Sequence, residues 1–157
     1  MMNRLVSGLI ALCCFGIGLL GADSPFTGTW KLDVTKSKFA KGHEYRELTV
    51  TLRDDGGSLL VGVQGMDGAG KPISTKYVLP AGGGPLNYTE GGPPAGTVTV
   101  AKWTDPRTIS SVTTLNGKET GTGRTVANAD GKTMTQTRTY VDAMGKSSKS
   151  VLHSERQ

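Results

Sequence analysis

Cysteine is confined to one short part of this 157-residue chain. Both cysteines, Cys13 and Cys14, lie within the first 22 residues, so residues 23–157 contain none. From residue 23 onward, disulfides, thiolate nucleophiles and cysteine metal ligands are therefore excluded together. The stability of this part has to come from packing alone.

Histidine and clustered basic charge are also scarce. The only histidines, His43 and His153, lie far apart in the sequence and lack metal-ligand spacing. No Gly-x-Ser-x-Gly motif is present, so we expect no enzyme, no metal and no cofactor. The chain carries a net charge of +5, but no run of four Lys or Arg residues occurs. We therefore expect no nucleic-acid partner.

Uncharged residues gather at the N-terminus. Arg4 precedes an uncharged run from Leu5 to Ala22, which is the order of a secretory signal peptide cleaved after Ala22. We expect a signal peptide at 1–22, one domain at 23–157, and a secreted or periplasmic location. The alternative is an uncleaved membrane anchor, because this run is just long enough to span a bilayer. After cleavage no segment could span a membrane.

The remaining composition favours strands over helices. Residues 23–157 hold 19 glycines, 20 threonines and 7 prolines. Gly and Pro are unfavourable inside helices, and Thr suits the pleated surface of a strand. Segments with period-two patterning, separated by turn residues, predict strands at 27–33, 44–53, 58–65, 73–79, 97–103, 108–115, 119–127, 133–141 and 147–155.

A Gly-Lys pair recurs every 14 residues and supports a meander of hairpins. It occurs at residues 117, 131 and 145, each time at a predicted turn. Asn116-Gly117 has the residues of a two-residue hairpin turn, because both tolerate positive φ. The C-terminal third should therefore form consecutive antiparallel pairs.

Alternation sorts the faces of the strands. Ile73, Tyr77 and Leu79 share one face of their predicted strand. Leu48, Val50 and Leu52 share one face of the strand predicted at 44–53. Either face of 133–141 carries Thr, Gln or Arg, which does not describe a dry core. Two explanations stay open: the strands line a wet, ligand-accepting cavity, or their polar groups pair with one another.

One irregular stretch, residues 80–96, interrupts the pattern and is rich in Gly and Pro. It is either a flexible connection or a mobile flap over a cavity mouth, with Leu86 and Tyr88 as contacting side chains.

The segment Phe26-Thr27-Gly28-Thr29-Trp30-Lys31-Leu32 resembles the opening of the calycins, which include fatty-acid-binding proteins and lipocalins. Extended to Phe39, it resembles small secreted bacterial lipocalin-like proteins. The resemblance implies that Gly28 lets the chain bend beneath a barrel floor which Trp30 closes. In calycins a late-strand arginine packs over this tryptophan; we assign Arg124 to that role, with Arg156 as the alternative.

A second likeness suggests a binding site. Arg138-Thr139-Tyr140 is similar to the Arg-x-Tyr pair with which fatty-acid-binding proteins hold a carboxylate. Residues two apart on a strand point to the same side, so Arg138 and Tyr140 would face a cavity together. We add Tyr77 as a third ligand-binding residue. The competing arrangement turns the Thr133–Thr139 face inward and leaves Arg138 in water.

These patterns predict an all-β fold, a single antiparallel up-and-down β-barrel of nine or ten strands of lipocalin-like, calycin type. We expect an exported protein that binds a small hydrophobic or anionic amphiphilic molecule in the barrel. One alternative is a filled barrel acting as a surface interaction or envelope module. Another is a small hydrolase or isomerase, which requires His43 or His153 to meet a carboxylate in a cleft.

Overall fold

The computed structural model describes residues 24–157, and every regular element in that range is a β-strand. The signal peptide expected at residues 1–22 lies outside the described residues. Within residues 24–157, no helix is long and apolar enough to cross a membrane. The strands are β1 (Gly28–Lys38), β2 (Tyr45–Asp55), β3 (Ser58–Asp67), β4 (Pro72–Leu79), β5 (Gly84–Pro85), β6 (Asn87–Glu90), β7 (Thr97–Asp105), β8 (Thr108–Leu115), β9 (Lys118–Ala127), β10 (Thr133–Val141) and β11 (Ser147–Arg156).

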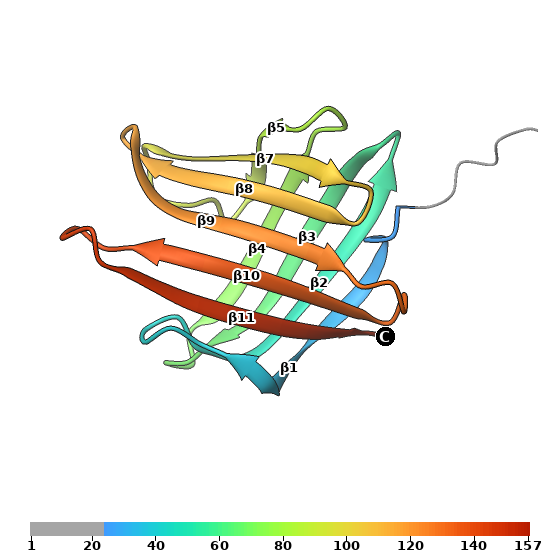
Figure 1. Cartoon of the computed structure of the whole chain (residues 1–157), viewed down its shortest axis with the longest axis horizontal. Coiled ribbons are helices and arrows are strands. Elements are labelled where there is room, and N and C mark those ends of the chain that lie inside the picture. The colour runs from blue at the N-terminus through green and yellow to red at the C-terminus, as the bar shows by residue number, and fades with distance from the viewer. Residues whose placement is uncertain (1–23) are drawn as a thin grey trace, which may run out of the picture.

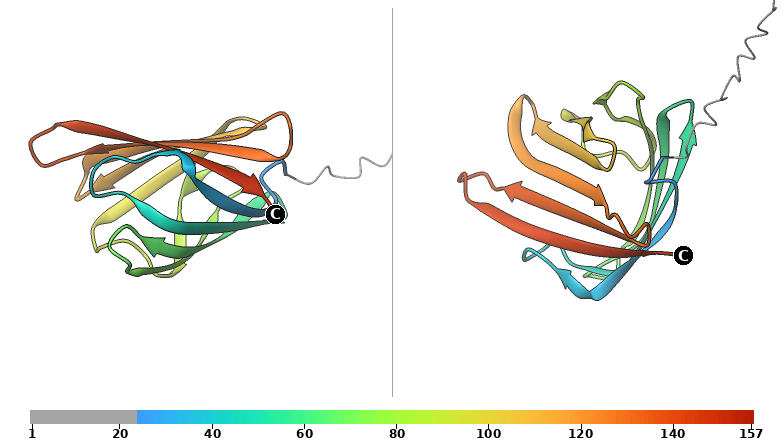
Figure 2. Two further views of the ribbon diagram at one scale, coloured as in Figure 1. Left: turned by 90° about the horizontal axis from the view of Figure 1, so that it is seen from below. Right: turned by 45° about the vertical axis from the view of Figure 1, so that its right-hand side comes forward.

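All eleven strands belong to one antiparallel sheet, in the order β5-β7-β8-β9-β10-β11-β1-β2-β3-β4-β6. The first long strand pairs with the last, because β1 lies between β11 and β2. β7 to β11 cross in front of β2 to β4 in Figure 1, and Figure 2 shows the same two layers from other directions. The chain is thus an up-and-down β-barrel, as the sequence predicts.

The segment 80–96 contains two short strands that join the two ends of the sheet, so it is more ordered than a loose connection. Leu86 and Tyr88 line a cavity of the barrel, as the flap alternative predicts, and movement of this segment stays a prediction. β5 pairs with β7, and β6 pairs with β4. Leu86 lies between these two short strands, donates its backbone N–H to the Thr99 carbonyl at 2.8 Å, and packs against the main core. These short strands raise the count to eleven instead of nine or ten. The other nine match the predicted ranges within a few residues.

The meander from β8 to β11 forms as the Gly-Lys repeat predicts. β8, β9, β10 and β11 pair consecutively and antiparallel. Asn116 and Gly117 both have positive φ, and Gly131 and Gly145 lie in the next two turns, also at positive φ. Each glycine therefore occupies a backbone conformation that side chains disfavour.

One end of the barrel is closed by an apolar floor. Trp30 and Phe26 have no exposed surface, and the Trp30 Nε1–H donates to the Phe26 carbonyl at 2.8 Å. The Arg156 guanidinium carbon lies 4.3 Å from the centroid of the Trp30 ring. Gly28 has a φ of 135°, and a Cβ there would lie 2.6 Å from the Arg156 guanidinium. Only glycine leaves room for this arginine.

The assignment of Arg124 to the floor was wrong. Trp30 pairs directly with Arg156 in the β1–β11 ladder, which brings the alternative arginine onto the ring. Arg124 lies opposite Thr137 on β9, on the face that points out of the barrel, and it is exposed. An alternating strand sends Arg124 and its neighbour Gly123 to opposite sides, and Gly123 is the inward residue.

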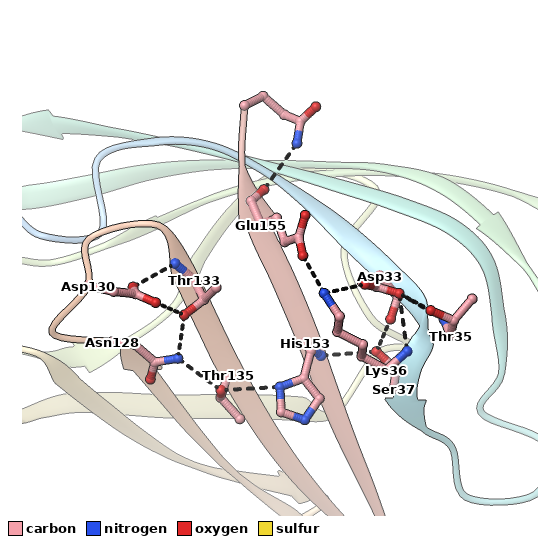
Figure 3. Close-up of polar contacts among 11 residues, drawn as sticks. Asp33, Thr35, Lys36, Ser37, Asn128, Asp130, Thr133, Thr135, His153 and Glu155 are labelled. Carbon is pink, nitrogen blue, oxygen red and sulfur yellow. Dashed lines mark hydrogen bonds and ion pairs between the residues drawn. The ribbon is translucent and has the colours of Figure 1, made fainter.

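A bulge in β1 lies on the outside of the seam, the junction at which β1 pairs with β11. The register shifts between Asp33 and Lys38, and an Asp33 carboxylate oxygen accepts from the Thr35 N–H and hydroxyl at 3.0 and 2.6 Å. Lys36 forms ion pairs with Asp33 at 3.1 Å and with Glu155 of β11 at 2.7 Å. Figure 3 shows these contacts joining β1 to β11. The junction of β1 and β11 is therefore held by hydrogen bonds and ion pairs on the outside of the barrel and by apolar packing on the inside.

Candidate functional site

The barrel interior holds two connected spaces. The outer chamber has a volume of about 470 Å³ and lies between β2, β3, β4 and β6 on one side and β7 to β10 on the other. The inner chamber, of about 100 Å³, lies deeper, against Phe26 and the floor-side core. Six residues line both chambers and so mark the passage between them: Val63, Tyr77, Leu86, Ser111, Gln136 and Arg138.

The parity of β10 decides which residues reach the cavity. Met134, Gln136, Arg138 and Tyr140 all line one of the chambers, so the even-numbered face points inward. On the odd-numbered face, Thr133, Thr135 and Thr137 line neither chamber, and only Thr139 borders the outer one. Thr133 and Thr135 are joined to Asn128 in an outer network visible in Figure 3. The competing arrangement with inward threonines is therefore wrong.

Small residues on both neighbouring strands make room for the two long side chains. Arg138 lies between Gly123 of β9 and Ser150 of β11. Tyr140 lies in the same way between Gly121 and Ser148. Directly opposed residues have close Cβ atoms, so a large side chain at any of these positions would compete for the same volume.

Arg138 is a partly buried cation inside the barrel that has no carboxylate partner. Its Nη1–H donates to the Tyr45 hydroxyl at 3.0 Å. Lys36 and Lys76 are the only cations that form ion pairs among residues 24–157, so no carboxylate neutralises Arg138. Burial lowers the pKa of Arg138, but the nearby Tyr45, Tyr140 and Tyr77 outweigh this and leave the pKa raised. The guanidinium is charged and faces the passage between the chambers.

Tyr140 presents an unsatisfied polar group beside this cation. Its hydroxyl is fully buried and has no hydrogen-bond partner among the described residues. Burial raises the pKa of Tyr140, with the Arg138 charge acting in the opposite direction, so the phenol is neutral and can donate a proton. An unpaired buried hydroxyl costs free energy unless something binds to it.

Tyr77 completes the group of predicted site residues. It lines both chambers, and its ring centroid lies 5.4 Å from that of Tyr88 on β6. Burial raises the pKa of Tyr77, so this phenol is neutral as well. The structure thus brings Arg138, Tyr140 and Tyr77 together around one cavity; their role in ligand binding stays a prediction.

The loop between β1 and β2 covers part of this site, a contact that no sequence pattern predicts. The His43 ring stacks on the Tyr140 ring with centroids 3.6 Å apart and an interplanar angle of 8°. The Ala40 N–H donates to the Ser150 hydroxyl at 2.8 Å, which ties the loop to β11. The sequence held one hint of the space around this site. Ser148 and Ser150 are two residues apart, as Arg138 and Tyr140 are, so the two small side chains share one face of their strand.

The histidines do not form a catalytic pair. His43 is exposed and stacked on Tyr140. His153 lies on the outer face of β11, where its ring nitrogen is 3.5 Å from the Thr135 hydroxyl (Figure 3). Within the described range, no three metal-binding side chains converge. The general base that the hydrolase alternative requires is therefore not assembled from either histidine.

Comparisons with known proteins give limited further information. No protein-family model and no curated protein matches the chain. Structures of apocrustacyanin C1 and apocrustacyanin C2 are similar to it, at 13% and 14% sequence identity, each with a TM-score of 0.43. The match covers 85% of this chain and 62% of each of those chains, so this chain spans less than two thirds of their length. The barrel architecture is therefore taken from the strand order of this chain itself, an antiparallel meander in which the last strand pairs with the first long strand.

Proposed function

We propose that this protein is an exported carrier that binds a small amphipathic anion inside the barrel. The anionic group occupies the passage between the two chambers, where it pairs with Arg138. The Tyr140 hydroxyl donates a hydrogen bond to the same group. The rest of the ligand extends into the outer chamber, whose volume of about 470 Å³ is in the usual range for small-molecule sites.

One observation carries this proposal, the unpaired charge of Arg138. A guanidinium that is partly withdrawn from water favours an anion or several acceptors, and here the Tyr45 phenol accepts from it and no carboxylate does. An anion arriving from solvent would form short, charge-assisted hydrogen bonds with the guanidinium. The neighbouring Tyr140 hydroxyl, buried and unsatisfied, lies where it can add a further donor.

A titration with a fluorescent fatty acid tests the anion-binding role. We expect the parent protein to bind it and Arg138→Met to bind about tenfold or more weakly, since charge-assisted hydrogen bonds contribute about 1.5–3 kcal/mol each. Arg124→Met is the matched control, because it makes the same change on the outer face of β9. The control variant should bind like the parent.

Two outcomes contradict the proposal. Equal affinity of the parent and Arg138→Met would remove Arg138 from the site. A loss of affinity as large in Arg124→Met would show that net positive charge attracts the probe, with no role for the buried position. Thermal unfolding of each variant checks that the barrel is intact.

Export is the second part of the proposal and is supported by the sequence alone. The uncharged run from Leu5 to Ala22 follows Arg4 and precedes Asp23. We expect the full chain, expressed in its own host, to be recovered outside the cytoplasm with Asp23 as its first residue. A protein that retains Met1 in the cytoplasmic fraction would contradict export and leave ligand binding untouched.

One observation favours the interaction-module alternative. Val98, Val100 and Val112 expose 47%, 46% and 42% of their surface. Val100 pairs directly with Val112 on the outer faces of β7 and β8. Exposed apolar clusters often mark contact surfaces. The test compares the parent with Val100→Lys. If the parent forms a larger assembly that Val100→Lys does not form, and the variant still binds ligand normally, this face has a separate interaction role.

A further inference from the structure

One wall of the outer chamber is made of hydroxyl and amide groups. Thr99 of β7, Ser111 and Thr113 of β8, and Gln136 of β10 line it. The Thr99 and Thr113 hydroxyl oxygens lie 2.9 Å apart, and the Gln136 amide donates to the Thr125 hydroxyl at 3.2 Å. This hydroxyl wall, defined by Thr99, Ser111, Thr113 and Gln136, is the side of the cavity next to Arg138.

The opposite wall is aromatic and aliphatic. Tyr45 of β2, Tyr77 of β4 and Tyr88 of β6 line the outer chamber there, together with Leu48 and Ile73. The Tyr77 and Tyr88 rings are inclined to each other by 50°, so their ring faces form an angled apolar surface. The outer chamber is therefore two-faced, with flat apolar groups on one side and hydrogen-bonding groups on the other.

The inner chamber limits what lies beyond Arg138. Its volume of about 100 Å³ is only a few times the roughly 30 Å³ that one water molecule occupies in the liquid. A long alkyl tail does not fit there, so a tail would have to run through the outer chamber. In that position it would cover the hydroxyl wall and strip water from polar groups without replacing its hydrogen bonds, which is unfavourable.

We propose, building on the proposed function, that the ligand is a compact ring that carries both a carboxylate and several hydroxyl groups. Its carboxylate binds Arg138 and Tyr140. One ring face packs on Tyr77 and Tyr88, and the ring hydroxyls bond to Ser111, Thr113 and Gln136. Sugar acids and hydroxylated aromatic acids share this chemistry, whereas long-chain fatty acids lack it.

Calorimetric titrations with matched acids test the ligand class. The aromatic pair is 3,4,5-trihydroxybenzoate and benzoate, and the saturated pair is glucuronate and cyclohexanecarboxylate. Hexadecanoate represents the long-chain acids. We expect at least one hydroxylated acid to bind about tenfold or more tightly than its unhydroxylated partner and more tightly than hexadecanoate, because tenfold corresponds to about one net hydrogen bond. The better pair identifies the aromatic or the sugar-acid source.

Variants of β8 test the position of the ring hydroxyls. Ser111→Ala combined with Thr113→Val removes two hydroxyls from the chamber, and it should erase most of the preference for the hydroxylated acid. The matched control is Ser110→Ala with Thr114→Val, whose side chains lie on the outer face of the same strand and line neither chamber. The control should keep the preference, and Ser111→Ala alone provides a milder variant if the double change unfolds the barrel.

The possible outcomes separate this inference from the function on which it rests. Tighter binding of hexadecanoate, with dependence on Arg138, would overturn the ligand class and keep the anion carrier. A preference for hydroxylated acids that survives loss of Ser111 and Thr113 hydroxyls would overturn the assigned wall. If no acid binds to the parent protein, both the ligand class and the proposed function are overturned.

Discussion

Arg156 performs two tasks at the barrel floor with one side chain. Its guanidinium lies over the Trp30 ring, and its N–H groups donate to backbone carbonyls of Pro25, Thr27 and Gly131. The contact therefore ties the N-terminal entry segment and the β9–β10 turn to the last strand. A cation over a tryptophan face adds to this, because the ring quadrupole attracts it.

Replacing this arginine tests the corrected floor assignment. We expect Arg156→Met to lower the free energy of unfolding by about 1–3 kcal/mol, since it removes charge-assisted hydrogen bonds. Arg124→Met should change it by less than about 0.5 kcal/mol, as for an exposed residue away from special contacts. Urea unfolding of both variants measures the difference. A larger loss for Arg124→Met would contradict the described floor.

Trp30 carries the largest packing contribution at the same place. Its side chain is fully buried, so Trp30→Ala should destabilise the protein by about 3–5 kcal/mol, as large-to-small core changes of aromatic residues do. Trp30→Phe should cost less, because it keeps an apolar ring while losing the hydrogen bond to Phe26. Thermal unfolding distinguishes the two. A Trp30→Ala protein as stable as the parent would argue against a structural floor.

At the scale of elements, the β1 bulge gives the seam a dependence on pH. Hydrogen bonds from Thr35 and Lys36 lower the pKa of the partly exposed Asp33 carboxyl from 3.8 to about 2. The ionised form is therefore favoured by the folded state. This stabilisation is complete above the unfolded pKa of 3.8 and is lost as the pH falls through the folded pKa of about 2.

Asp33→Asn tests this contribution. The variant should be less stable than the parent near neutral pH, where Asp33 is ionised in both states. The difference should shrink as the pH falls from about 4 to about 2, because the parent then loses the same charge. Denaturant unfolding across this range measures it. A stability difference that stays constant down to the lowest pH would refute a role for the ionised carboxylate.

The elements themselves could largely be predicted from the sequence, because alternation and turn chemistry are local. Asn116-Gly117 and the Gly-Lys repeat determine the hairpins without knowledge of distant contacts. Local patterns could not decide whether Arg124 or Arg156 lies over Trp30, because the answer depends on how β1 pairs with β11. Alternation places Arg124 and Gly123 on opposite faces, but which of the two faces the cavity follows only from the ladder with β10.

The candidate site was predictable to a similar extent. Period two places Arg138 and Tyr140 on one face, but the choice of that face depends on the space left by β9 and β11. Gly121 and Gly123 opposite them are the decisive residues, and they became informative only once the register was known. His43 reaches Tyr140 through a loop between other strands, which no local pattern indicates.

At the scale of the whole molecule, apolar packing and polar lining occupy opposite ends of one barrel. Trp30, Phe26 and Leu59 are completely buried at the floor. Towards the other end lie the partly buried Arg138, which has no carboxylate partner, and the buried Tyr140 hydroxyl, which has no hydrogen-bond partner among the described residues. Polar groups withdrawn from water cost free energy when they are left unpaired, which is why we propose an anionic ligand above the apolar floor.

Native mass spectrometry of the protein purified from its own host tests this account most directly. The parent should carry a bound small acid, visible as a defined added mass that disappears when the protein is denatured. Arg138→Met, purified in the same way, should lack that mass, whereas Arg124→Met should retain it. The same added mass on Arg138→Met as on the parent would contradict the central claim that Arg138 holds an anionic ligand in the barrel.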